Sequence, residues 1–121
     1  MIACVDSDVL IDYFDGIDAA AHELGRYDAL LISRISWIEV LVGARTASLF
    51  QLREDFLRQF KIIELDATVA RKAISLRKMH RLRLPDAIVW ASAQVNRALL
   101  ITRNTKDFPR NHPGVRAPYS N

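Results

Sequence analysis

This chain lacks a second cysteine and any long apolar run, and both absences narrow the kind of protein it can be. Because Cys4 is its one cysteine, no internal disulfide can form, and a reducing compartment is expected. No segment approaches the roughly 20 apolar residues of a membrane helix. Asp6, Asp8 and Asp12 also interrupt the stretch that a signal peptide would need. We therefore expect a cytoplasmic protein that is not held in a membrane.

The composition that remains is that of an ordinary globular protein. Half of the residues are apolar and 26% are charged, which argues against a disordered or fibrous chain. A length of 121 residues suits one domain that spans residues 1–121. The net charge is +3 and the pI is about 9.4. This excess of positive charge favours an anionic partner, of which nucleic acid is the commonest.

Short apolar runs alternate with helical patterns along the chain. Continuous apolar runs typical of strands buried on both faces occur at residues 2–5, 29–32 and 98–101, and residues 62–65, which include Glu64, are also expected to form a strand. Between them, apolar positions recur at helical spacing, as in the amphipathic stretch 49–60. This alternation predicts βαβ units and an α/β fold, with a mostly parallel sheet covered on both faces. The tail, residues 109–121, contains three prolines and favours irregular structure with room for a short edge strand.

Three helix starts carry sequence signals. The run Ser36-Trp37-Ile38-Glu39 has the form of a capping box that opens a helix. Asp66 occupies the place of an N-cap. Pro85 suits the first turn of a helix that continues through Asp86 to about residue 95.

Three carboxylates follow strands or open helices. Asp6 stands at the carboxyl end of the first strand, and Glu39 and Asp86 lie in the first turns of helices. Each also has a purely structural explanation, as an N-cap, a capping-box acid or a partner of the helix dipole. A parallel sheet, however, brings such positions to one edge, where the functional crevice of open α/β sheets lies. Carboxylates gathered there repel each other unless a cation neutralises them, so the cluster predicts Mg²⁺, with Mn²⁺ as a substitute.

A fourth group is expected after the last strand, in the segment TRNTKDF at 102–108. Asn104 offers a neutral oxygen and Asp107 a charged one, and either completes a metal site. Thr102 is placed to bind a ligating water. Asp8 adds negative charge beside Asp6.

Four segments, VDSDVLIDYF, ISWIEVLVGA, LRLPDAIVWASA and LITRNTKDF, together resemble the PIN-domain family. The likeness is strongest to the VapC-type toxins of bacterial toxin–antitoxin pairs, and it spans nearly the whole chain. It implies a three-layer α/β/α fold in which Asp6, Glu39 and Asp86 are the catalytic, metal-binding acids. Many members carry an acid where this chain has Asn104, and we choose Asp107 as the fourth acid.

The resemblance also implies an activity and partners. It implies a Mg²⁺-dependent endoribonuclease that hydrolyses RNA phosphodiester bonds and leaves a 5′-phosphate and a 3′-hydroxyl. A groove formed by residues of about 42–60 is expected to receive a cognate antitoxin. A homodimer or a toxin–antitoxin hetero-oligomer is expected as the assembled form.

Basic residues flank the acids on both sides and are candidates for RNA contacts. Arg81 and Arg83 lead into Asp86, and Arg103 and Lys106 surround the last strand end. Such side chains hold a phosphate backbone against a site, although an ordinary solvated surface has the same composition. The three histidines follow no strand end, so the sequence gives no support to a histidine base.

Three other functions compete with this interpretation. Asp6-Ser7-Asp8 matches the DxD start of haloacid-dehalogenase-like phosphatases, but the chain supplies no paired acidic motif downstream. A receiver-like signalling domain needs a phosphate-accepting Asp on a central strand, a role that Glu39 does not fill. A PIN scaffold that only binds a partner is distinguished by testing whether metal binding and cleavage depend on Asp6 and Asp86.

Overall fold

All strands of the protein join one parallel sheet. The computed structural model describes residues 1–120. The five strands pair in parallel in the order β3-β2-β1-β4-β5. Their bounds are β1 Ile2–Val5, β2 Ala29–Ser33, β3 Lys61–Ile63, β4 Leu99–Ile101 and β5 Val115–Arg116.

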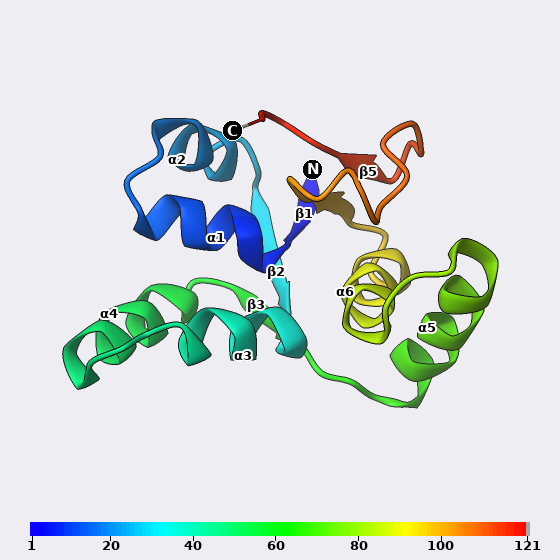
Figure 1. Ribbon diagram of the computed structural model, residues 1–121, viewed down its shortest axis with the longest axis horizontal. Coiled ribbons are helices and arrows are strands. Elements are labelled where there is room, and N and C mark those ends of the chain that lie inside the picture. The colour runs from blue at the N-terminus through cyan, green and yellow to red at the C-terminus, as the bar shows by residue number, and fades with distance from the viewer. Residues whose placement is uncertain (121) are drawn as a thin grey trace.

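Helices cover both faces of this sheet. They are α1 Ser7–Phe14, α2 Asp18–Leu24, α3 Arg34–Val42, α4 Ala47–Leu57, α5 Ala67–His80 and α6 Leu84–Val95. Figure 1 shows α1 to α4 on one side of the strands and α5 and α6 on the other. The predicted three-layer α/β class is thereby confirmed. Among residues 1–120, no helix combines the length and the apolar character needed to cross a membrane.

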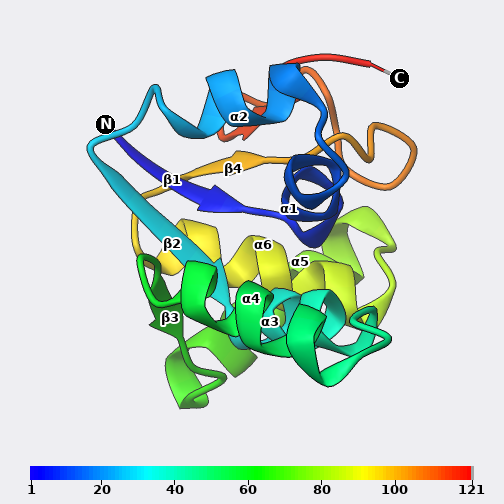
Figure 2. The same cartoon turned by 90° about the vertical axis from the view of Figure 1, so that its left-hand side faces the viewer.

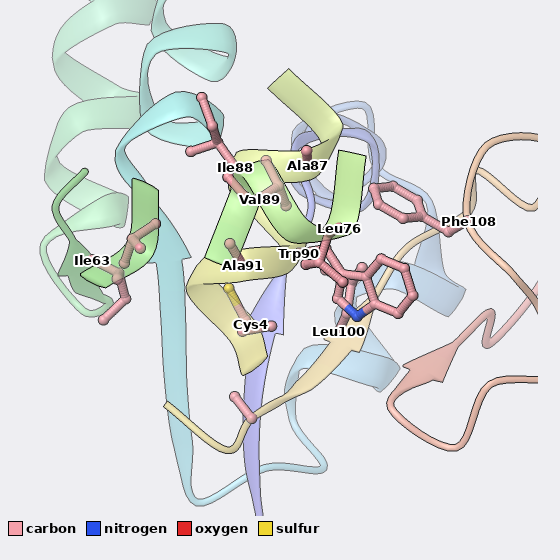
Figure 3. Close-up of a cluster of buried hydrophobic side chains, with 14 of the residues drawn as sticks. Cys4, Ile63, Leu76, Ala87, Ile88, Val89, Trp90, Ala91, Leu100 and Phe108 are labelled. Carbon is pink, nitrogen blue, oxygen red and sulfur yellow. The ribbon is translucent and has the colours of Figure 1, made fainter. Parts of the chain in front are cut away.

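Each face of the sheet has its own hydrophobic core, as the alternation of side chains along β1 requires. Ala3 and Val5 pack with the core under α1 to α4, whereas Cys4 joins the core under α5 and α6. The second core centres on α6, from which Trp90 reaches between the sheet and the last loops (Figure 3). The Trp90 side chain is fully buried and meets Phe108 edge to face.

Two predicted boundaries differ from the observed ones. The capping box at Ser36 was expected to open α3, but Ser33 is the N-cap and accepts a hydrogen bond from the Ile35 amide at 3.2 Å. Ser33 ends β2 in an extended conformation, so it is the first side chain able to reach a free amide of the helix. Ser36 is therefore buried inside the helix. The third strand spans Lys61–Ile63 rather than residues 62–65.

Other local signals are confirmed. Asp66 caps α5 through a hydrogen bond from the Val69 amide at 2.9 Å, and Pro85 lies in the first turn of α6. The tail supplies β5 as a short edge strand, which pairs in parallel with β4.

The strand order creates a switch point at the middle of the sheet. From β1 the chain moves outward to β2 and β3, then crosses to β4 on the other side of β1 (Figure 2). The carboxyl ends of β1 and β4 thus lie side by side, and the Asp6 amide donates to the Ile101 carbonyl at 2.9 Å. In open α/β sheets this position forms the functional crevice.

Replacing the central aromatic side chain of the α5/α6 core tests how much stability that core supplies. We expect Trp90→Ala to lower the free energy of unfolding by about 3 to 5 kcal/mol, because the cavity would be fully enclosed. Urea unfolding followed by circular dichroism measures the change. Met79→Ala, on the exposed side of α5, serves as the control and should change it by less than about 0.5 kcal/mol. A loss below about 1 kcal/mol for Trp90→Ala would contradict this account of the core.

Candidate functional site

Asp6 lies at the centre of the switch point. It ends β1 and caps α1, and its side chain is only 7% exposed. One carboxylate oxygen accepts a hydrogen bond from the Ser7 amide, and the other accepts from the Thr102 hydroxyl, both at 2.8 Å. Two adjacent strand ends therefore hold this buried carboxylate in one orientation.

Two further acids lie beside Asp6. Asp8, in the first turn of α1, accepts hydrogen bonds from the Arg103 amide at 3.1 and 3.3 Å. Glu39 comes from α3 and accepts a hydrogen bond from the Ser7 hydroxyl at 3.0 Å. Ser7 thus links Asp6 to Glu39, and the consecutive residues Thr102 and Arg103 link Asp6 to Asp8.

The other two predicted acids form a second group. Asp86, in the first turn of α6, and Asp107, after β4, are joined by Arg83. The guanidinium of Arg83 lies 3.2 Å from Asp86 and 3.5 Å from Asp107. Asn104 donates to the Asp107 carboxylate at 2.9 Å and accepts from the Asp107 amide at 3.2 Å, which fixes that side chain.

The loop of residues 102–107 connects the two groups. The Thr102 hydroxyl donates to Asp6 and accepts from the Asn104 amide at 3.0 Å, so one side chain links the first group to the residue that holds Asp107. Of the auxiliary residues predicted from the sequence, Thr102 contacts Asp6 and Asn104 contacts Asp107, whereas Asp8 is held by the Arg103 amide. Hereafter, the acidic centre means Asp6, Asp8, Glu39, Asp86 and Asp107.

Burial and mutual repulsion disfavour the charged form of several of these acids. Desolvation, followed by the nearby Asp8 charge, raises the pKa of Asp6 to about 7, although hydrogen bonds from Thr102 and Ser7 oppose this shift. Desolvation also raises the pKa of Asp8 and of Asp86. The charged acidic centre is therefore under electrostatic stress that a cation would relieve.

The donor chemistry fits a hard divalent cation, since every acid offers oxygen ligands and the site is poor in nitrogen and sulfur. Within residues 1–120, no three Asp, Glu, His or Cys side chains already stand together as a complete metal cage. Asp86 and Asp107 instead share the positive charge of Arg83. The residues present thus suit a metal in type and charge.

The four predicted RNA-contacting residues divide into two kinds. Arg81, which ends α5, and Lys106, in the loop of residues 102–107, are exposed. Arg83 is engaged by Asp86 and Asp107, and Arg103 turns toward α1, where its guanidinium makes a two-pronged contact with Asp12 at 2.7 and 3.1 Å. Within residues 1–120, Arg81 and Lys106 make no side-chain ion pair with a carboxylate, whereas Arg83 and Arg103 do.

Three residues around the site were not predicted from the sequence. Ser7 bridges Asp6 and Glu39, Asp12 holds Arg103, and the Tyr119 hydroxyl donates to Asp12 at 2.8 Å. Asp12 has a visible signal, because it stands one helical turn after Asp8 on the same face of α1. Tyr119 has none, since it belongs to the irregular tail.

Comparisons with known proteins agree on one family. The sequence model described as PIN domain matches residues 3–112. Ribonuclease VapC10 of Mycobacterium tuberculosis is 34% identical over 113 residues, which cover 87% of this chain and 84% of that protein.

Solved structures with the same fold include two toxin–antitoxin assemblies. A chain of a toxin–antitoxin complex from Klebsiella pneumoniae is 42% identical, with a TM-score of 0.92 and 98% coverage of both chains. A chain of VapBC2 from Rickettsia felis, bound to a DNA fragment from their promoter, is 22% identical with a TM-score of 0.79, over 95% of this chain and 96% of that one. At this lower identity the likeness concerns the fold alone.

The raised pKa of Asp6 predicts how stability without metal depends on pH. The folded chain keeps the Asp6 proton up to a pKa of about 7, whereas the unfolded chain releases it near 3.8. The stabilisation by this proton is complete below pH 3.8 and is lost as the pH rises through 7, by up to about 1.4 kcal/mol per pH unit. Urea unfolding in EDTA at pH 5 and pH 7.5 should show this decline. Asp6→Asn should lessen it, leaving the part due to the raised pKa values of Asp8 and Asp86, and identical slopes for parent and variant would contradict the assignment.

Proposed function

The chain belongs to the PIN domain family and, within it, to the VapC ribonucleases, and from this premise we propose that it is a metal-dependent endoribonuclease. We propose further that it acts as the toxin of a toxin–antitoxin pair. Because the chain belongs to this family, we reject the phosphatase alternative, which rested on the short Asp6-Ser7-Asp8 motif alone.

One observation carries the proposal. A buried carboxylate, Asp6, is held by Ser7 and Thr102 beside two more acids at the switch point of a parallel sheet. An N-cap does not require other acids beside it. Asp66, for example, caps α5 as a single exposed acid. Gathering like charges at one buried position is unfavourable unless the site binds something positive.

Asp6, Glu39, Asp86 and Asp107 would hold the divalent cation, Mg²⁺ or Mn²⁺. When bound, such an ion activates water and stabilises the negative charge that develops on a phosphodiester during hydrolysis. The protein residues supply orientation, since Thr102 fixes Asp6 and Asn104 fixes Asp107. Asp8 adds negative charge next to Asp6 and so strengthens the attraction for the ion.

The RNA would lie over the acidic centre between exposed cations. Arg81 ends α5 in a left-handed conformation, and Lys106 projects from the 102–107 loop. Both are exposed, so their charges remain available to phosphates.

A cognate antitoxin is the partner that fits the exposed apolar side chains of α3 and α4. Val42 is 78% exposed and Leu52 is 60% exposed, and Ile38, Leu49 and Phe50 are also exposed. This area falls largely within the predicted groove of residues 42–60. Such a surface on a small protein is typical of a partner interface, and a similar chain is found in a toxin–antitoxin complex.

Cleavage of mixed RNA by purified protein tests the proposal. We expect cutting with Mg²⁺, none with EDTA, and a loss of at least about a hundredfold for Asp6→Asn and for Asp86→Asn, because each removes a charge that would contact the ion. Asp66→Asn is the matched control, since Asp66 is also a helix N-cap but lies on α5 outside the acidic centre. It should cut like the parent.

The opposite results identify the alternative. If Asp6→Asn and Asp86→Asn cut as fast as the parent, the observed activity does not come from this centre. The chain would then be a scaffold that only binds a partner.

The proposed RNA contact of Lys106 has its own test. In the Asp86→Asn background, which we expect to bind RNA without cutting it, Lys106→Gln should weaken binding and lower the slope of log Kd against log salt by about 0.7, as for one phosphate contact to a single strand. Fluorescence anisotropy at several salt concentrations gives this slope. Lys72→Gln, exposed on α5, should leave the slope unchanged. If Lys106→Gln and Lys72→Gln gave the same slope of log Kd against log salt, Lys106 would not contact the RNA.

A further inference from the structure

The tail after β5 is tied to α1 by a buried carboxylate. Tyr119 packs against the core under α1 to α4, and its hydroxyl donates to Asp12 at 2.8 Å. Asp12 is 5% exposed and receives both prongs of the Arg103 guanidinium. Residues more than 90 positions apart in sequence thus meet at one carboxylate.

Arg103 also holds one acid of the acidic centre, Asp8, through its main chain. Its amide donates to both oxygens of Asp8, and the preceding residue, Thr102, donates to Asp6. Arg103 therefore contacts α1 twice, with its side chain at Asp12 and with its backbone amide at Asp8, one helical turn away. A shift of the contact at Asp12 moves the donors to Asp6 and Asp8 with it.

We propose that the Asp12–Arg103 pair, closed by the Tyr119 hydroxyl, is a positioning device that sets the metal affinity of the acidic centre. This inference rests on the proposed metal-dependent function. A two-pronged arginine–carboxylate contact fixes orientation as well as distance, and the hydroxyl of Tyr119 restrains the carboxylate that receives it. Arg103 is thereby a positioning residue and not a contact for RNA.

The protein contains a second arrangement of the same chemistry that serves as a control. Glu23, on α2, is buried, receives both prongs of the Arg116 guanidinium at 2.7 and 3.1 Å, and accepts a hydrogen bond from the Tyr27 hydroxyl. Within residues 1–120, Glu23 makes no hydrogen bond to an acid or to residues 102–107. Loss of either tyrosine hydroxyl thus removes the same kind of bond, but only one of them borders the acidic centre.

The test measures Mn²⁺ binding by isothermal titration calorimetry, without RNA, for the parent, Tyr119→Phe, Tyr27→Phe and Arg103→Lys. Thermal unfolding in EDTA records the stability of each. We expect Tyr119→Phe to weaken Mn²⁺ binding by up to about tenfold, the lower end of the loss found for side chains that hydrogen-bond metal ligands directly, because Tyr119 acts on the centre only through Asp12 and Arg103. Arg103→Lys, which keeps the charge but not the two-pronged contact, should weaken it at least as much. Tyr27→Phe should bind within about twofold of the parent, even where its stability falls as far as that of Tyr119→Phe.

Each outcome has a distinct meaning. Parental Mn²⁺ affinity in folded Tyr119→Phe and Arg103→Lys overturns the inference but leaves the proposed function intact. Equal weakening in Tyr27→Phe also overturns it, since the effect would then follow general stability. A parent protein that binds no Mn²⁺ overturns the proposed function, and this inference with it.

Discussion

Parallel pairing of β1 with β2 on one side and β4 on the other is the constraint from which the rest of the structure follows. Because these three neighbouring strands are parallel, their carboxyl ends lie at the same edge of the sheet. The residues that follow each strand therefore lie close together there. Asp6 follows β1, α3 with Glu39 follows β2, and Thr102 follows β4. Asp6 and Glu39 are therefore close together because the topology places both at this edge of the sheet.

The repulsion between these neighbouring carboxylates has to be compensated. Hydrogen-bond donors at the same edge of the sheet compensate part of it. Backbone amides of Ser7 and Arg103 and the hydroxyl of Thr102 all point at carboxylates. These donors partly offset the cost of burying Asp6, whose pKa nevertheless stays raised. The centre is thus held in place while its affinity for positive charge is retained.

Much of this arrangement could be predicted from the sequence because it depends on local patterns. The apolar run before Asp6, the N-cap at Asp66 and Pro85 in a first turn each reflect neighbours within a few residues. The predicted N-cap at Ser36 was wrong because a capping box is recognised by residue spacing alone. Ser33, at the end of the preceding strand, caps the same helix instead. Contacts such as Tyr119 with Asp12 depend on where the tail crosses α1, which no local pattern encodes.

The bridge of Arg83 between Asp86 and Asp107 has a consequence for how a metal would enter. With an internal counter-ion in place, these two acids can reach their folded positions before any ion arrives. Binding of the proposed divalent cation at this pair would therefore require the Arg83 guanidinium to give up its two ion pairs. Because Arg83 directly precedes α6, which carries Asp86, a guanidinium released in this way would remain near the pair, so filling the proposed site would also free a positive charge beside it.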